Sequence, residues 1–414
     1  MRKLFCGAAA VLIFQSLILA AEPVATQVEP ALAPNAELLA RIANMPENTW
    51  LKLPPIKTAG DIGALDKSFK TTGPTVRDFC NKMVWAPERQ RALYCGGGHN
   101  IHPFNDVWEY DLASNTWVCL YGADPAPPPA YAPDVNKSVE WFKAHAVLKD
   151  GLVRSPHGAP LRPCHTWWSL AYDPDRRQLL YLESHKGLFG INKNALAQAL
   201  GFDPKNPEFA LYGSGAGDSW LFTFDPAKRE WGEVYPKVPK AGESSCLEYL
   251  PDSKTLWWLS GKTYRFEGAQ KAWLPFPSAK PIPLAGETAY DPESRKMVYV
   301  DGQQTWVFSC DSGAWTLAQE HASDGGRVPE STFCYDSVAR MFVLYTSLKL
   351  ADGTCEPRLR LYDLKENKWI DPKPQGECPK LGNVAGYYDP ARNVTVIYNQ
   401  SATWVYRCKK TAMK

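Results

Sequence analysis

The stretch that decides the fold is residues 85–117, WAPERQRALYCGGGHNIHPFNDVWEYDLASNTW. It begins with Trp85 and a Pro-containing turn, and an apolar run follows that ends at Tyr94. Tyr110 and Trp117 then stand seven residues apart, with turn-forming residues between them. Asp, Asn and Pro initiate turns, and aromatic and β-branched residues favour the strands on either side. The stretch therefore predicts four short strands joined by tight turns.

The same pattern recurs five more times along the chain. The copies begin at Trp85-Ala86-Pro87, Tyr172-Asp173-Pro174, Tyr249-Leu250-Pro251, Tyr290-Asp291-Pro292, Tyr335-Asp336 and Tyr388-Asp389-Pro390. Five of them end with an aromatic residue and a Trp seven positions later: Tyr110 and Trp117, Phe224 and Trp231, Phe266 and Trp273, Phe308 and Trp315, Tyr362 and Trp369. Self-similarity of this kind is typical of repeat architectures.

The sixth copy reaches Tyr406, but Met413 stands where its Trp is expected. The missing piece lies near the other end of the chain, where Glu47-Asn48-Thr49-Trp50-Leu51 resembles Ser114-Asn115-Thr116-Trp117-Val118. We therefore expect an all-β, six-bladed propeller of four-stranded antiparallel blades, with the last blade closed by an N-terminal strand. Such closure removes the open sheet edges that invite aggregation.

These residues resemble the kelch-repeat, galactose-oxidase-type β-propeller superfamily. Residues 95–99, CGGGH, are followed by residues 105–111, NDVWEYD, and then by Trp117, which matches the kelch pattern of a glycine pair, an aromatic residue and a spaced Trp. The resemblance covers roughly residues 47–408, and only the first copy keeps the glycine pair. It implies that the loop between the second and third strands of a blade lies on the same face as the connection to the next blade.

The N-terminus predicts an exported protein. Met1 to Lys3 are basic, Leu4 to Phe14 form an apolar run, and small residues precede Glu22. This is the pattern of a secretory signal peptide over residues 1–21, and the run is too short for a membrane-spanning anchor. We expect a secreted or periplasmic protein with no membrane insertion after signal cleavage. Residues 22–46 are expected to form a linker and a short helix with Asn35 as its N-cap, and residues 409–414 a C-terminal tail.

The charge balance gives no sign of a nucleic-acid partner. Without Arg2 and Lys3, the expected mature chain carries 44 basic and 44 acidic residues, taken from totals of 46 and 44. A nucleic-acid or anionic-membrane partner would require a basic excess or patch. A carbohydrate, another small polar ligand or a protein partner fits a neutral chain.

Ten cysteines remain after Cys6, and export makes disulfides possible. Candidate pairs are Cys119 with Cys164, Cys355 with Cys378, and Cys80 with Cys95. Buried, reduced thiols are the alternative. The chain has no Cys-x-x-Cys motif, so redox catalysis is not expected.

Two long insertions interrupt the repeat in blades one and two. They cover roughly residues 118–163 and 183–219, and the resemblance places both on one face. Loops of this length on a rigid scaffold are usually functional or disordered. We expect them to cover the channel mouth; a plug or an oligomer contact is the alternative.

Seven histidines map to loops or strand ends on that face: His99, His102, His145, His157, His165, His185 and His321. His99 and His165 are the candidates for acid/base catalysis. Together with a carboxylate such as Glu183 or Asp106, imidazoles suit a transition metal. Their spacing matches no compact metal motif, so hydrogen bonding to a polar ligand or to the loops stays the alternative, and no metal or other cofactor is assigned.

Other residues near the starts of the inner strands are candidates for ligand binding: Arg77, His102, Arg162, Trp167, His185, Glu287, Arg327 and Asn383. Charged and amide groups bind sugar hydroxyls, and flat aromatic faces stack on sugar C–H surfaces. Each of them is alternatively a structural residue of a strand end or a core.

Two hypotheses for function follow. The first is a secreted binding module that holds a carbohydrate or another polar ligand in the channel mouth. The second is a sugar-acting enzyme with mutarotase-like or lyase-type acid/base chemistry, with or without the assistance of a metal, because a secreted six-bladed kelch protein is also similar to periplasmic sialic acid mutarotases. Galactose oxidation is excluded, since the chain lacks the Tyr-His pair and the extra domain of the copper-radical oxidases.

Overall fold

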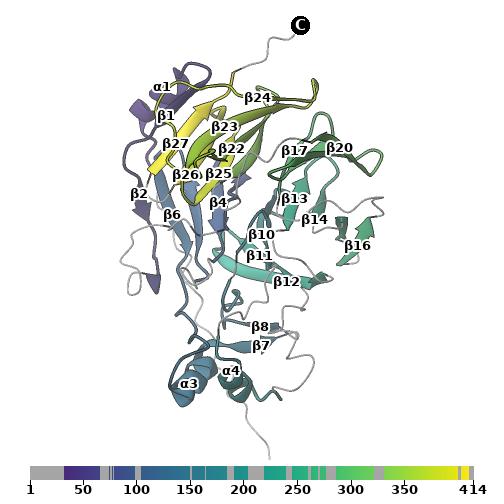
Figure 1. The fold of residues 1–414 in the computed structure, drawn as a ribbon. Coiled ribbons are helices and arrows are strands. Elements are labelled where there is room, and N and C mark those ends of the chain that lie inside the picture. The colour runs from purple at the N-terminus through teal and green to yellow at the C-terminus, as the bar shows by residue number, and fades with distance from the viewer. Residues whose placement is uncertain are drawn as a thin grey trace, which may run out of the picture. The chain divides into compact units, whose positions relative to one another are not determined.

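The computed structural model contains six four-stranded antiparallel blades, which confirms the predicted propeller (Figure 1). It describes residues 32–65, 74, 77, 79–97, 104–149, 152–163, 165–183, 191–203, 219–238, 245–259, 263–268, 271–276, 286–320, 331–399 and 402–409. Residues 1–31 lie outside the described residues. The signal sequence therefore stays a prediction.

The blades follow the chain in order. Blade one contains β3 (Val84–Ala86), β4 (Arg91–Cys95), β5 (Val107–Asp111) and β6 (Thr116–Tyr121), and blade two contains β9 (Leu170–Asp173), β10 (Gln178–Glu183), β11 (Ser219–Asp225) and β12 (Glu230–Val238). Blade three contains β13 (Cys246–Leu250), β14 (Thr255–Leu259), β15 (Thr263–Glu267) and β16 (Ala272–Phe276), and blade four contains β17 (Glu287–Asp291), β18 (Lys296–Val300), β19 (Gln304–Ser309) and β20 (Ala314–Glu320).

Blade five contains β21 (Thr332–Asp336), β22 (Met341–Lys349), β23 (Cys355–Asp363) and β24 (Lys368–Ile370). Blade six contains β25 (Val384–Asp389), β26 (Val394–Asn399), β27 (Ala402–Arg407) and the N-terminal β1 (Thr49–Lys52). The first strands of the blades contact one another in sequence, from β3 through β9, β13, β17, β21 and β25 back to β3. These six inner strands therefore form a closed ring.

The seven-residue spacing of each aromatic residue and Trp is explained by strand register. The two residues lie directly opposite each other on the third and fourth strands of a blade, as Tyr110 and Trp117 do in blade one. The six pairs have ring centroids 5.0 to 5.3 Å apart. In blade six the pair is Tyr406 and Trp50, so the N-terminal strand supplies the Trp that the last copy lacks.

The Asp residues of the repeat build the tight turns. Asp173 Oδ1 accepts hydrogen bonds of 3.0 Å from the backbone N–H groups of Asp175 and Arg176, and Asp336 binds Val338 and Ala339 in the same way. A residue with positive φ then ends each of these turns, Arg177 at 56° and Arg340 at 57°. The short side chain of Asp thus replaces backbone hydrogen bonds that the turn lacks.

Hydroxyl groups of the repeated Tyr residues join neighbouring blades. Tyr249 donates to Asp175 Oδ2 of blade two at 2.6 Å, and Tyr290 donates to Asp252 Oδ1 of blade three at 2.6 Å. Tyr172 donates to Glu88 of blade one. The acceptor is in each case a carboxylate in the first turn of the preceding blade, so this part of the repeat serves both the turn and the interface between blades.

The N-terminal segment adds two elements to the ring. Helix α1 (Ala36–Ala43) begins after Asn35, whose Oδ1 accepts the Leu38 N–H at 3.0 Å. Strand β2 (Lys57–Ala59) pairs parallel to β6 as a fifth strand of blade one, which the repeat did not predict. The chain can approach this closely because Gly60 has φ 92° and a Cβ there would lie 2.4 Å from the Cys119 carbonyl oxygen.

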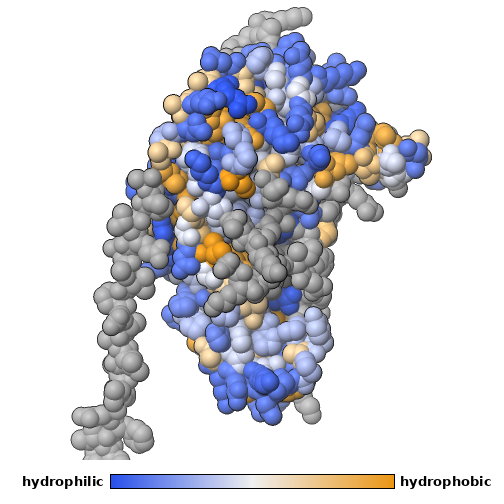
Figure 2. All heavy atoms as spheres, turned by 90° about the vertical axis from the view of Figure 1, so that its left-hand side faces the viewer, coloured by the Kyte–Doolittle hydropathy of each residue, from blue (hydrophilic) through white to orange (hydrophobic). Residues whose placement is uncertain are grey.

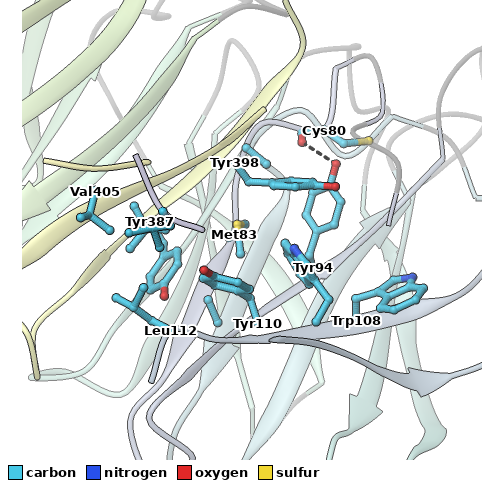
Figure 3. Packing of buried hydrophobic residues seen from close by; sticks show 14 of the residues in the cluster. Cys80, Met83, Tyr94, Trp108, Tyr110, Leu112, Tyr387, Tyr398 and Val405 are labelled. Carbon is cyan, nitrogen blue, oxygen red and sulfur yellow. Dashed lines mark hydrogen bonds between the residues drawn. The ribbon is translucent and has the colours of Figure 1, made fainter. Parts of the chain in front are cut away.

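A large cluster of buried side chains fills the interface of blades one and six (Figure 3). Tyr94 and Tyr110 of blade one lie in it with Tyr387 and Tyr398 of blade six, and the Tyr94 hydroxyl donates to the Cys80 carbonyl at 3.1 Å. Buried residues of α1 belong to the same cluster. The last interface of the ring to be completed along the chain is therefore a packed core.

The two long insertions share a small core of their own. Helix α3 (Val135–His145) packs against α4 (Lys193–Leu200), and the hairpin of β7 (Val147–Lys149) and β8 (Leu152–Arg154) lies beside them (Figure 1). Phe142 and Leu196 are buried in this core. Figure 2 shows mainly hydrophilic residues over the lower end, where α3 and α4 lie. The insertions thus come together, while their role as a cover over the channel stays a prediction.

The structure corrects two predicted disulfides. Cys80 and Cys95 both remain thiols. The Cys80 thiol donates to the Gly97 carbonyl at 3.5 Å, and its sulfur accepts the Thr166 N–H at 3.4 Å. Cys355 and Cys378 are unbridged as well. Cys119 is also a thiol and donates to the Tyr121 carbonyl at 3.3 Å; its predicted partner Cys164 lies outside the described residues. The positions of the cysteines in the repeat were a guide to neighbouring segments, but a disulfide also requires a specific Cβ geometry.

Candidate functional site

The candidate site lies where the inner strands of blades one, two and four begin. The chain enters β3 through residues 79–83 and β9 through residues 165–169, and these two segments pair by a parallel bridge between Cys80 and Trp167. A second bridge joins Trp168 to Cys246 of β13. Main-chain pairing between blades therefore fixes the side chains that project from this end of the ring.

Phe79, His165 and Trp167 form an aromatic cluster at this end. The ring centroids of Phe79 and Trp167 are 4.5 Å apart, and those of Phe79 and His165 are 4.7 Å apart. Phe79 has φ 59° and Trp167 has φ 47°, although neither is in one of the repeat turns. Positive φ is unfavourable for bulky side chains, and such strain is concentrated at functional sites.

Trp168 and Glu287 are the buried polar pair of the site. Trp168 is 1% exposed and Glu287, the first residue of β17, is 3% exposed. Burial raises the pKa of Glu287 to about 8, and the Ser331 hydroxyl and the Trp168 indole oppose this rise only in part. Glu287 Oε2 has no hydrogen-bond partner among the described residues. Glu287 is therefore a neutral carboxyl group at neutral pH, with unused hydrogen-bonding capacity.

A partly buried ion pair connects the segment before β3 with strand β13 next to this position. Lys82 Nζ lies 2.6 Å from Glu248 Oε1 of β13 and donates to the Leu247 carbonyl at 2.7 Å. Thr288 Oγ1, adjacent to Glu287 in β17, donates to the same Glu248 oxygen at 2.7 Å. Lys82 and Glu248 thus neutralise each other and join blade one to blade three.

Arg77 lies inside blade one. Its Nη2 contacts Asp106 Oδ2 at 2.6 Å, with both side chains fully buried, and its Nη1 donates to the Gly96 carbonyl. Trp108 Nε1 donates to the same Asp106 oxygen. Burial alone lowers the pKa of Arg77, but the Asp106 charge and nearby Tyr94 hold it above its ordinary value. Arg77 and Asp106 are therefore engaged with each other inside blade one, and Trp108 is a further partner of the carboxylate.

The remaining predicted site residues divide into two groups. Arg162 is buried in the connection that leads to β9, and Asn383 is half-buried just before β25. His99, His102, His185 and Arg327 lie outside the described residues, as do His321 and the side chain of Glu183. Of the predicted set, the structure brings together His165, Trp167 and, through Trp168, Glu287.

Two other histidines have local contacts in the insertions. His145 Nδ1 lies 2.9 Å from the Trp141 carbonyl and its ring stacks on Trp141, and His157 Nδ1 lies 3.0 Å from Asp124 Oδ1. The described residues contain no group of three or more His, Cys, Asp or Glu side chains arranged to hold a metal ion.

Sequence reasoning missed Phe79, Lys82 and Glu248. The positive φ of Phe79 could not be predicted from its residue type, because Phe is not a turn former. Lys82 was detectable as a charged residue next to the apolar start of β3, but its partner on another blade was not.

Comparisons with known proteins give a fold likeness and no family. No protein-family model matches the chain, and no curated protein does. Among solved structures, an auxiliary nutrient binding protein from Bacteroides thetaiotaomicron VPI-5482 is similar, with a TM-score of 0.46 and 9% sequence identity over 86% of this chain and 76% of that chain. No helix among the described residues is long and apolar enough to cross a bilayer.

Proposed function

We propose that the protein binds a carbohydrate or a similar polar ligand at the end of the ring where Trp167, Trp168 and Glu287 lie. The observation that carries the proposal is Glu287, a buried carboxyl group whose Oε2 has no partner among the described residues. Leaving a buried polar atom unsatisfied costs about 1–3 kcal/mol, so such an atom calls for an explanation, and a ligand hydroxyl is one.

The aromatic residues support a sugar as the ligand. Trp167 and Phe79 hold strained backbone conformations beside Trp168, and the indole N–H group of Trp167 lacks a hydrogen-bond partner among the described residues. Flat rings with a free polar edge suit sugar rings, which have C–H faces and hydroxyl rims. His165 at this cluster is a proposed ligand contact, and His99, His102, His185, Arg162, Arg327 and Asn383 stay proposals of the same kind.

A glycan array with residues 22–414 tests the proposal, followed by calorimetric titration of the best glycan. We expect Glu287→Gln and Trp168→Phe to weaken binding, while exposed Glu356→Gln leaves it unchanged. Trp168→Phe keeps a ring and removes only the indole N–H and some volume. If no glycan binds, or if both site variants bind as tightly as the parent protein, the proposal is wrong.

A second candidate function, a sugar-acting enzyme, is favoured by one observation. A carboxyl group with pKa about 8 is protonated at neutral pH, as a general acid must be. In this reading Glu287 is the acid, and His165 and His99 are the proposed base or metal-binding groups. The test is NMR of sugar-anomer exchange together with a polysaccharide lyase assay. His165→Ala should abolish turnover and leave affinity largely intact; absence of turnover by the parent protein would reject the enzyme.

A further inference from the structure

Buried acidic groups in the described residues are almost all balanced by a positive partner or by N–H donors. Asp106 contacts Arg77 and Glu248 contacts Lys82, both at 2.6 Å. Glu109 contacts Arg91 at 2.6 Å and Arg89 at 2.5 Å. The buried turn residue Asp336 accepts two backbone N–H bonds through Oδ1, although its Oδ2 has no hydrogen-bond partner among the described residues. A carboxylate that is buried without such partners loses its hydration and gains no interaction in exchange, so its burial strongly destabilises the folded state. This explains the pattern.

Glu287 differs from these residues. Unlike Asp106, Glu109 and Glu248, it forms no ion pair in the described part of the chain, and unlike Asp336 it accepts no N–H bond from a turn there. Its Oε2 has no hydrogen-bond partner among the same residues. The titratable groups that influence it or share its surroundings are the thiols of Cys246 and Cys334 and the hydroxyl of Tyr299, all neutral because burial raises the pKa of each. Lys82 and Glu248 also lie near Cys246, but they neutralise each other. Among the residues that the structure describes, no cation is therefore left to balance the Glu287 carboxyl group.

We propose that the ligand presents a protonated amine to Glu287, as an amino sugar does. The inference rests on the proposed function and deepens it by naming the ligand class. The aromatic surroundings agree with a cation, because the Trp168 indole lies beside the carboxyl group. The ring centroids of Trp167 and Trp168 are 6.0 Å apart, and those of Phe79 and Trp167 are 4.5 Å apart. Indole rings attract ammonium groups through their electron-rich faces.

Binding then includes a proton transfer to solvent. In the unliganded protein at neutral pH the Glu287 carboxyl keeps its proton. When the ammonium group binds, the carboxylate becomes the more stable form, so the carboxyl proton leaves to the buffer and the ligand keeps its own. One proton is released for each ligand bound. A neutral sugar that accepts a hydrogen bond from the carboxyl group releases none.

The experiment compares three β-1,4-linked oligosaccharides of equal length, built from glucosamine, N-acetylglucosamine and glucose. They share a backbone and differ in an ammonium, an acetamide or a hydroxyl group at one position. Calorimetric titration is run near neutral pH in two buffers of different ionisation enthalpy. We expect the glucosamine oligomer to bind at least about 30-fold more tightly than the other two, with release of close to one proton.

Glu287→Gln is the decisive variant, because Gln has the shape of a neutral carboxyl group and cannot ionise. It should bring the glucosamine oligomer down to the affinity of the uncharged pair and abolish proton release, whereas Glu356→Gln should change neither. The inference is overturned if the uncharged oligomers bind as tightly as the charged one, if binding releases no proton, or if the glucosamine oligomer does not bind. Binding of an uncharged glycan would then leave the proposed function standing, whereas a glycan array without any ligand would remove both.

Discussion

The ring of Trp50 packs on the ring of Tyr406 with centroids 5.0 Å apart, and the two residues are direct partners on β1 and β27. Trp50 is also in edge contact with Tyr345 of blade five, at 6.1 Å. A single residue near the N-terminus therefore completes the last blade and packs against the blade before it. Its contribution to the closed ring is open to direct measurement.

Trp50→Ala should lower the free energy of unfolding by about 3–5 kcal/mol, because it removes a buried indole and leaves a cavity. Urea unfolding followed by circular dichroism measures this loss. Leu148→Ala, at an exposed position on β7, is the control and should change stability little. A Trp50→Ala protein as stable as the parent would contradict closure of the ring by the N-terminal strand.

Glu287→Gln should stabilise the protein in a pH-dependent manner. The unfolded chain loses the Glu287 proton near pH 4.5, whereas the folded protein keeps it to about pH 8. Between these values the folded state binds more protons, so the parent loses stability as pH rises and the variant does not. The stability of the variant relative to the parent should be almost unchanged near pH 4.5 and should rise by a few kcal/mol near pH 8. Each tenfold change in proton affinity corresponds to about 1.4 kcal/mol.

Thermal unfolding of the parent and the variant across this pH range tests the expectation, because all other titrating groups are common to both proteins. A constant difference between the two curves would mean that Glu287 ionises normally in the folded state.

Tyr172→Phe should cost about 1 kcal/mol of stability, because it removes the hydroxyl that donates to Glu88 across the interface of blades one and two. The ring itself stays buried in its cluster. Tyr131→Phe, at a position 87% exposed, is the matched control. Equal unfolding midpoints for all three proteins would show that the contacts between Tyr and carboxylate contribute nothing to the joining of blades.

Arg77→Met should destabilise the protein by about 3–5 kcal/mol, because it leaves Asp106 charged and buried without its partner. The double variant with Asp106→Leu should recover part of this loss, since neither charge then remains. Chemical denaturation of the parent and both variants provides the measurement. An Arg77→Met protein that is fully stable but fails to bind glycan would instead assign Arg77 to the ligand.

The sequence determined the blades so clearly because each repeat position has a local cause. The spacing of Tyr110 and Trp117 is the register of a hairpin, and Asp173 marks a turn through its own hydrogen bonds. Trp50 was assigned to the last blade because the residues around it resemble those around Trp117. Features of this kind depend on neighbours in the chain, so a single sequence is sufficient to find them.

The rest depends on distances between blades. The pair of Lys82 and Glu248 joins strands of blades one and three, and nothing near either residue indicates the other. Parallel strand β2 depends on the approach of Gly60 to Cys119, and the thiols of Cys80 and Cys95 depend on Cβ geometry that spacing does not specify. Glu287 was found as a polar residue at the start of an inner strand, but its missing partner became visible only with the structure.

Pairing of β1 with β27 also sets the order of events during synthesis. The strand that leaves the ribosome early has to wait, with an unpaired edge, until β27 (Ala402–Arg407) has been made. Contacts so far apart in sequence form late and slowly, and exposed strand edges are prone to wrong pairing in the meantime. A chain that stops before β27 leaves β1 and its Trp50 without their partners, so the ring closes only after residues 402–407 have been made.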